Sequence, residues 1–215
     1  MKSIIPGILF LALPAIAFGG GSAITLTQSW SGTLAIPDNS GVGASNTVTI
    51  IAPVLDRIES VTVAIELEGG WNGDLYAYLV HDGTLAILLN RPGRTALDDL
   101  GSGSANLIAL FDDLAAGDVH MLLPGSGNAT GTWQPDGRNI DPLLALDTTP
   151  RVKMLDGFTN ANPNGDWTLF IADQNPGDTA TLKSWTLSVT AVPEPSTGVL
   201  AALAVGCFLR RRRSC

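Results

Sequence analysis

The stretch "IESVTVAIELE", residues 58 to 68, is the clearest sign of fold type in this sequence. Apolar side chains stand at every second position, Val61, Val63, Ile65 and Leu67, with mostly polar side chains between them. A period of two places successive side chains on opposite faces of a β-strand. The stretch is therefore predicted to be a strand with one face in a core and the other toward solvent.

The stretch "PNGDWTLFIAD", residues 163 to 173, adds a turn to the same pattern. Asn164-Gly165 provides the positive φ that a tight turn requires, and Asp166 is expected to bond neighbouring backbone N–H groups. Alternate side chains then enter the predicted core: Trp167, Leu169 and Ile171.

Turn-forming sequences such as "PDNSG", "HDGT", "NRPG" and "NPGD" separate further runs of this kind. Strands are predicted at residues 24–30, 47–51, 75–80, 85–89, 106–111 and 182–192. The only helical turn expected is "DPLLALD", residues 141 to 147. Short strands with regular turns and almost no helix predict an all-β fold, a jelly-roll β-sandwich of about eight antiparallel strands.

The first 17 residues have the composition of a secretory signal peptide. Lys2 supplies the positive start, residues 4–13 the apolar run, and Ala15-Ile16-Ala17 a small-residue cleavage site. The chain is therefore expected to be exported, with a mature domain over residues 18–192 and a separate tail over residues 193–215.

The tail begins with Pro193, Glu194 and Pro195, which enforce an extended break, and continues with an apolar run. It closes with four arginines, Arg210, Arg211, Arg212 and Arg213. A helix of about 13 residues spans about 20 Å, short of the ~30 Å hydrocarbon core of a bilayer. Because arginines stay in the cytoplasm, a weak tail anchor of this kind would leave the domain outside.

This order of Pro-Glu-Pro, short apolar run and arginine cluster closely resembles the PEP-CTERM sorting signal of Gram-negative bacteria. The resemblance implies an exosortase-type partner, a membrane cysteine transpeptidase that cleaves near the Pro-Glu-Pro. The chain would then be anchored transiently in the inner membrane and reach the cell surface or the extracellular matrix. A simple tail anchor is the alternative.

Removal of both ends leaves seven basic and 19 acidic residues, a net charge of −12 for residues 18–192. Nothing in such a domain neutralises phosphates, so nucleic acid is excluded as a partner. Both cysteines, Cys207 and Cys215, lie in the tail. The mature domain is therefore expected to have neither a disulfide nor a thiol nucleophile.

Four stretches in order carry a second resemblance: "GGWNGDLYAYLVHDG" (69–83), "NLIALFDD" (106–113), "GTWQPDG" (131–137) and "NPNGDWTLFIADQNPGDTATLKSWTLSV" (162–189). They are similar to the P domain (P/Homo B domain) of subtilisin-like proprotein convertases and many bacterial secreted proteins. The resemblance covers residues 35–189 and implies an eight-stranded jelly roll that elsewhere follows a protease domain and supports its folding. This chain departs from the family by "ATL" in place of Gly-Thr-Leu in the last turn, and by a longer segment over residues 138–156.

An enzymatic role is not expected. Nucleophilic catalysis needs a positioned base, and the only histidines, His81 and His120, are predicted to be surface or half-buried loop residues. The sequence has no G-x-S-x-G, and no cluster of His or Cys for zinc. Asp74 and Asp166 could pair as in a glycosidase, but both stand at strand entrances as turn formers.

The aspartates allow two interpretations. The family resemblance implies a calcium site that includes Asp74, Asp112 and Asp113, completed by Asp166 or Asp173. Those two residues bracket one strand, and the ends of a strand of ~7 residues lie ~20 Å apart, so only one of them could contribute. In the alternative, the aspartates cap turns through backbone N–H groups.

Two tryptophans are candidates for a face that binds a glycan or a surface protein, because each lies at a strand end beside glycine or serine: Trp71 and Trp30. The other three, Trp133, Trp167 and Trp185, are expected to fill the core. The sequence thus favours an exported, non-catalytic and adhesive module of the cell surface or matrix. The alternatives are a carbohydrate-active hydrolase and an accessory that assists a separate serine endopeptidase.

Overall fold

The computed structural model describes residues 22–122 and 128–193 of the 215-residue chain. The predicted signal peptide and the tail residues Glu194, Pro195 and Arg210 to Arg213 lie outside these ranges. The described chain folds into nine strands: β1 (Ile24–Ala35), β2 (Ser40–Ile50), β3 (Leu55–Gly69), β4 (Leu75–His81), β5 (Thr84–Asn90), β6 (Ala105–Phe111), β7 (Asn128–Trp133), β8 (Gly165–Asp173) and β9 (Ala180–Pro193). Three single-turn 3-10 helices join them: η1 (Asn72–Asp74), η2 (Val119–Met121) and η3 (Leu155–Phe158).

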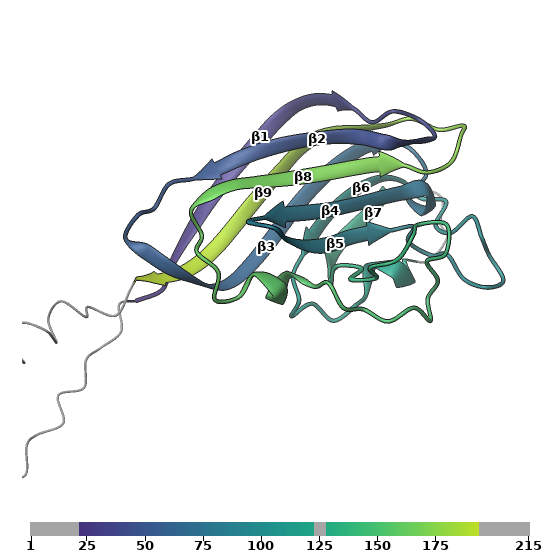
Figure 1. Ribbon diagram of the computed structural model, residues 1–215. Helices are drawn as coiled ribbons and strands as arrows, with labels where there is room; N and C mark the ends of the chain where they lie inside the picture. Colours follow the sequence, from purple (N-terminus) through teal and green to yellow (C-terminus); the bar gives the residue numbers. More distant parts are fainter. Residues whose placement is uncertain (1–21, 123–127, 194–215) are drawn as a thin grey trace, which may run out of the picture.

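The strands form two sheets that pack face to face (Figure 1). One sheet has five strands in the order β1-β9-β3-β6-β7, and the other has four in the order β2-β8-β4-β5. Neighbouring strands are antiparallel except β6 and β7, which run parallel. The prediction of an all-β sandwich is confirmed, with one strand more than expected and this parallel pair.

The core between the sheets is made of the alternating side chains that the sequence predicted. On β3 the inward residues Val63, Ile65 and Leu67 are buried, as are the β8 and β9 residues Trp167, Leu169, Ile171, Trp185, Leu187 and Val189. Burial of each large apolar side chain contributes roughly 1.5–3 kcal/mol, so this layer is the main source of stability.

The long central strand β9 defines two ends of the sandwich. At one end Pro193 pairs with Leu55 and Ala191 pairs with Ile24, and we call this the tail end. At the other end Ala180 pairs with Gly69, and we call this the loop end. A strand of 14 residues at ~3.4 Å per residue separates them by about 45 Å.

Two details differ from the sequence-based predictions. Residues 141–147 form hydrogen-bonded turns without a helix, closed by Leu144 N–H donating to the Asp141 carbonyl at 2.8 Å. The strand β7 was not predicted at all. Its sequence, "NATGTW", has no apolar alternation, and the strand is held by pairing with β6 rather than by its own pattern.

The turn before β8 keeps its predicted geometry but uses its polar groups differently. Gly165 has the expected positive φ of 115°. Asp166, however, does not cap the turn; its Oδ1 accepts a hydrogen bond from the Thr49 hydroxyl on β2 at 2.7 Å. The turn is instead fastened by Asn164, whose Nδ2 donates to the carbonyls of Ala52 and Leu55 at 3.2 Å.

Candidate functional site

A pocket of about 570 Å³ opens at the loop end of the sandwich. Four separate segments build it: the η1 turn, the loop between β5 and β6, the turn between β8 and β9, and the loop around residue 143. The polar and aromatic side chains that line it are Trp71, Asp74, Arg91, Arg94, Asp99, Asn175 and Asp178. We refer to it as the Trp71 pocket.

Trp71 is held in a half-buried position by close contact with a glycine-rich loop. Its Nε1 donates to the Leu100 carbonyl at 3.3 Å. A Cβ at Gly103 would come within 2.8 Å of the indole, and a Cβ at Gly73 within 2.2 Å of the Leu100 oxygen. Because neither position has room for a side chain, glycine at both lets the loop pack against the indole and leaves part of the ring facing the pocket.

The centre of the pocket is a buried polar cluster around Asp74, which is 7% exposed. Its Oδ1 accepts a hydrogen bond from Asn175 Nδ2 at 2.7 Å and a charged one from Arg91 Nη2 at 3.4 Å. Burial raises the pKa of Asp74, while the bonds from Asn175 and Arg91 oppose that rise. Arg91 is itself fixed, since its Nε donates to the Gly73 carbonyl at 2.9 Å.

Arg94 ties the β5–β6 loop to the long segment between β7 and β8. Its Nη1 donates to the Pro142 carbonyl at 3.2 Å, and its Nε donates to the Asp99 carbonyl at 3.2 Å. The segment 138–156, whose role the sequence left open, also bonds the outer edge of β5, where Ile87 N–H donates to the Lys153 carbonyl at 2.9 Å. It therefore covers that edge and supplies one wall of the pocket.

Asp173 lies beside this cluster, at the end of β8, and is 1% exposed. Its Oδ1 accepts the Asn175 N–H at 3.1 Å, whereas Oδ2 is buried with no hydrogen-bond partner among the described residues. Burial raises the pKa of Asp173 to about 6; the Asn175 bond opposes this, and the carboxylates of Asp74, Asp38 and Asp178 add to it.

The four aspartates proposed as calcium ligands do not meet. Asp74 stands at the start of β4, where Leu75 pairs with Asp173. Asp166 stands at the other end of β4, next to Trp167, which pairs with His81. Asp112 accepts the Leu114 N–H, and Asp113 accepts the N–H groups of η3 at Leu155 and Asp156. Burial raises the pKa of Asp113, while those two backbone bonds lower it.

Within residues 22–122 and 128–193 there is no group of three or more His, Cys, Asp or Glu side chains placed to hold a metal ion. The separation of Asp74 from Asp166 by the length of β4 also leaves no glycosidase-like pair between them, because such carboxyls stand within about 10 Å.

The prediction for the histidines was wrong, since both are buried. His81, 3% exposed, ends β4, and its two ring nitrogens face the carbonyls of Asp166 at 2.9 Å and Asn162 at 2.8 Å. Its ring stacks on Trp167 with centroids 4.0 Å apart and 1° between planes.

His120 is 1% exposed and belongs to a structural ion network. Its Nδ1 lies 2.7 Å from Asp136 Oδ2, and its Nε2 bonds the Arg94 carbonyl at 2.9 Å. Arg138 Nη2 bonds Asp118 Oδ2 at 2.9 Å in the same network. In the described chain no ring nitrogen of either histidine is hydrogen-bonded to a hydroxyl group, so neither is placed as the base of a nucleophile.

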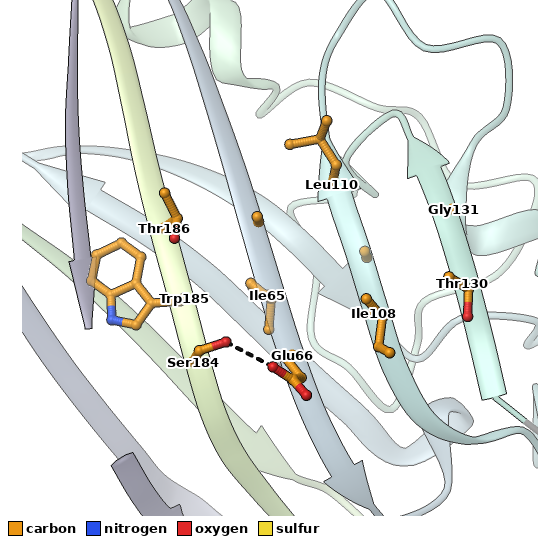
Figure 2. Close-up of a pocket in the computed structure, with 11 residues that line it drawn as sticks. Ile65, Glu66, Ile108, Leu110, Thr130, Gly131, Ser184, Trp185 and Thr186 are labelled. Atoms are coloured by element: carbon orange, nitrogen blue, oxygen red, sulfur yellow. Dashed lines mark hydrogen bonds between the residues drawn. The ribbon is translucent and has the colours of Figure 1, made fainter. Parts of the chain in front are cut away.

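A second, shallower hollow of about 380 Å³ lies on the outer face of the five-stranded sheet (Figure 2). Its outward residues include the exposed apolar side chains Ile108 and Leu110 and the pair Ser184–Glu66, which share a hydrogen bond of 3.0 Å. It combines one carboxylate with small hydroxyl groups, and the one aromatic residue that lines it, Trp185, is only 1% exposed.

The sequence predicted Trp71 and Asp74 as site residues but missed their neighbours. Arg91, Arg94 and Asn175 stand in turns that were recognised only as turns. Of the core tryptophans, Trp167 and Trp185 are buried as expected, whereas Trp133 is partly buried with its Nε1 unbonded in the described structure. Trp30 is half-buried on the edge strand β1 and is not among the residues that line the pocket.

Comparison with known families gives two matches. Residues 147–189 match the family described as proprotein convertase P-domain, and residues 191–213 match the PEP-CTERM protein-sorting motif. Both resemblances inferred from the sequence are thereby confirmed, the P-domain one over residues 147–189 of the 35–189 predicted, a part that contains β8 and most of β9.

Among solved structures, the chain is similar to an Aeromonas sobria serine protease, alone and in a complex of that protease and the chaperone. The complex matches with 19% identity and a TM-score of 0.46 over 80% of this chain and 27% of that chain. The protease alone gives 19% and 0.46, over 79% and 27%. This chain thus spans about a quarter of the length of those chains.

No curated protein matches the sequence. The described residues contain no helix with the length and apolar character needed to cross a bilayer.

Proposed function

We propose that this chain, which joins a P-domain segment to a PEP-CTERM sorting motif, is an exported non-catalytic module that holds a neutral glycan in the Trp71 pocket at the cell surface or in the matrix. The PEP-CTERM motif marks a secreted protein of Gram-negative bacteria that is processed by an exosortase-type system. The P-domain is an accessory module rather than a catalytic one.

The observation that carries this proposal is the make-up of the Trp71 pocket. A partly exposed indole offers a flat apolar face for a sugar ring, and the less buried side chains of Arg94, Asn175 and Asp178 beside it offer acceptors and donors for hydroxyl groups. Arg91 and Arg94 offset two of the three carboxylates that line it, those of Asp74, Asp99 and Asp178. The slight excess of negative charge favours a neutral sugar over an anionic one.

The position of the pocket supports a role at a surface. The pocket lies at the loop end, and the sorting motif follows Pro193 at the tail end, about 45 Å away along β9. A chain attached through its tail would therefore present the pocket outward, where it can contact a polymer or a neighbouring cell.

The test is affinity electrophoresis of the full chain in gels that contain neutral or acidic polysaccharides. Retardation by a neutral polysaccharide is expected for the natural chain and for Trp133→Ala, and is expected to be lost in Trp71→Ala. Both variants remove one half-buried tryptophan, so they are matched. Retention of the retardation in Trp71→Ala would place the binding face elsewhere and refute the proposal.

We propose in addition that calcium stabilises the loop end weakly, through Asp74 of the four predicted ligands together with Asp173. The support is the buried Asp173 Oδ2, which has no partner in the described structure. Two carboxylates leave most of the shell of a calcium ion to main-chain oxygens and water, which is typical of weak extracellular sites with Kd of ~10⁻⁴ to 10⁻³ M.

Calcium at ten times Kd would add about 1.4 kcal/mol to stability. Melting curves with calcium, magnesium and a chelator test this, with Asp173→Asn as the variant that should not respond. Equal midpoints in all three conditions would contradict calcium binding.

The match to the P-domain family favours one second candidate, an accessory that assists a separate serine endopeptidase. In that case the chain would raise the yield of active protease during refolding of the endopeptidase secreted by the same cell. The Trp71→Ala variant would then act like the natural chain, because assistance of this kind does not require the sugar pocket.

A further inference from the structure

The strand β1 is a sheet edge without the usual protection against pairing with another chain. It closes one side of the five-stranded sheet, and only β9 pairs with it in the described structure (Figure 1). Its 12 residues, "ITLTQSWSGTLA", include no charged residue and no proline. Natural proteins commonly protect such an edge with lysine, proline or a bulge.

The bulge that β1 does have leaves most of the strand regular. The register against β9 shifts between Ser31 and Leu34, so Ile24 to Ser31 form an uninterrupted ladder. Every second backbone N–H and C=O of that ladder points away from β9, as in any edge strand. These groups are available to a second strand.

The edges of the other sheet are less open. The β5 edge is bonded by the segment that follows β7, where Asp136 N–H donates to the Leu88 carbonyl at 3.1 Å. The β2 edge is broken by a register shift between Ser40 and Ala44, with Gly43 at a φ of 58°. Of the edge strands β1, β2 and β5, β1 thus has the longest regular stretch that no other segment bonds.

The sequence of β1 is complementary to itself when two copies run antiparallel with Gln28 opposite Gln28. On the inner face, Leu26 of each copy then lies opposite Trp30 of the other. These two apolar pairs stand on either side of the central Gln28–Gln28 pair. On the outer face it sets Thr27 opposite Ser29 and Thr25 opposite Ser31, which are hydroxyl pairs. Cross-strand pairs of like chemistry each contribute roughly 0.2–1 kcal/mol.

The existing contact of β1 with β9 supports the hydroxyl pairs, because it uses the same chemistry. Thr25 bonds Thr190 at 2.9 Å, Thr27 bonds Ser188 at 3.4 Å, and Ser29 bonds Thr186 at 2.9 Å. A second β1 strand would continue these rungs outward.

Charge also favours a second copy at this edge rather than elsewhere. Residues 18–192 carry a net charge of −12, so most faces of two copies repel each other. The β1 strand contributes none of that charge. Two copies can therefore approach edge to edge without placing like charges opposite one another.

We infer that β1 is a homodimer interface, in which two copies pair antiparallel about Gln28 and join their five-stranded sheets into one. The two-fold axis sets the tail end of one copy beside the bulged half of β1 in the other, so the two Trp71 pockets point in opposite directions. Such a dimer is divalent, and it can link two polymers or two surfaces. The pairing itself does not depend on what the pocket binds.

Cysteine cross-linking of the full chain tests the interface and its register. Cys207→Ser and Cys215→Ser first remove the only thiols. In this background Gln28→Cys should form a disulfide with its own copy, and a mixture of Thr25→Cys and Ser31→Cys chains should form a mixed disulfide. The matched control is Val42→Cys, which is 84% exposed on the other edge strand, β2.

Paired thiols have a high effective concentration, so Gln28→Cys should cross-link about tenfold faster than Val42→Cys or more. When Gln28→Lys is added to both the Thr25→Cys and the Ser31→Cys chains, two lysines face each other at the centre of the paired strands. This repulsion should abolish the mixed disulfide. Equal rates for Gln28→Cys and Val42→Cys would overturn the inference, and so would self-linking of Thr25→Cys alone. Since Trp71→Ala should leave these rates unchanged, failure of the dimer and failure of the glycan proposal are separable.

Discussion

The buried carboxyl of Asp173 is expected to contribute stability in mild acid that is lost at neutral pH. Asp173 is 1% exposed, and Oδ2 has no partner in the described chain. Burial, opposed by the bond from Asn175 and reinforced by the nearby carboxylates of Asp74, Asp38 and Asp178, raises its pKa from 3.8 to about 6. Arg91 is engaged by Asp74 in the same cluster.

The sign follows from the raised pKa in the folded state. Below pH 3.8 the carboxyl is protonated in both the folded and the unfolded chain, so it has no effect on pH dependence. As pH rises from there to about 6, the unfolded chain loses this proton while the folded chain keeps it, and stability falls. A shift of about two pKa units corresponds to about 3 kcal/mol, lost by pH 7.

The variant Asp173→Asn removes the ionisation and keeps the shape. At pH 7.5 it should be more stable than the natural chain by up to about 3 kcal/mol, and at pH 4 the two should agree within about 1 kcal/mol. The assay is urea unfolding followed by tryptophan fluorescence at both pH values. Asp178→Asn, an exposed neighbour, is the control and should change little at either pH. A difference between Asp173→Asn and the natural chain that is the same at pH 4 and pH 7.5 would refute this explanation.

Two more predictions concern His81 and the chain ends. His81→Leu removes the ring nitrogens that face the carbonyls of Asp166 and Asn162 and should cost about 2–4 kcal/mol by urea unfolding; a loss below about 1 kcal/mol would show that these contacts contribute little. Intact-mass measurement of the cell-surface form should show loss of residues 1–17 and of Arg210 to Arg213; recovery of a chain that keeps those arginines would favour a simple tail anchor.

The sandwich could be predicted from sequence wherever an apolar period of two coincides with a strand. That condition holds for β3, β4, β8 and β9, whose alternate residues are buried. It fails in the glycine- and serine-rich half of β2 and in β7. Those residues become strands because a neighbour offers a ladder of backbone groups, and this information belongs to the partner strand rather than to the local pattern.

The site was predictable only in part, for a related reason. Trp71 and Asp74 lie three residues apart in the turn between β3 and β4, so their place at one end of the sandwich could be inferred locally. Arg91 and Asn175 reach the same carboxyl from 17 and 101 residues away, and their meeting depends on the pairing of β4 with β5 and β8. The burial of the two histidines was not predicted because their rings bond backbone carbonyls, and no side-chain pattern in the sequence shows where those carbonyls lie.

The bonding of Asp74 favours binding over hydrolysis at the Trp71 pocket. A general acid needs a carboxyl that is free to exchange a proton with a substrate oxygen, and a second carboxyl within about 10 Å to complete the reaction. Asp74 instead directs Oδ1 at Asn175 and Arg91, so two donors already occupy that oxygen. Its predicted partner Asp166 stands at the other end of β4 and bonds Thr49. Asp173, the carboxyl near it, is buried under the turn that carries Asn175 and bonds that turn. The two carboxyls thus hold the loops that shape the pocket, and the surface left for a ligand is the indole face with the less buried polar side chains beside it, which suits recognition of a sugar ring rather than its cleavage.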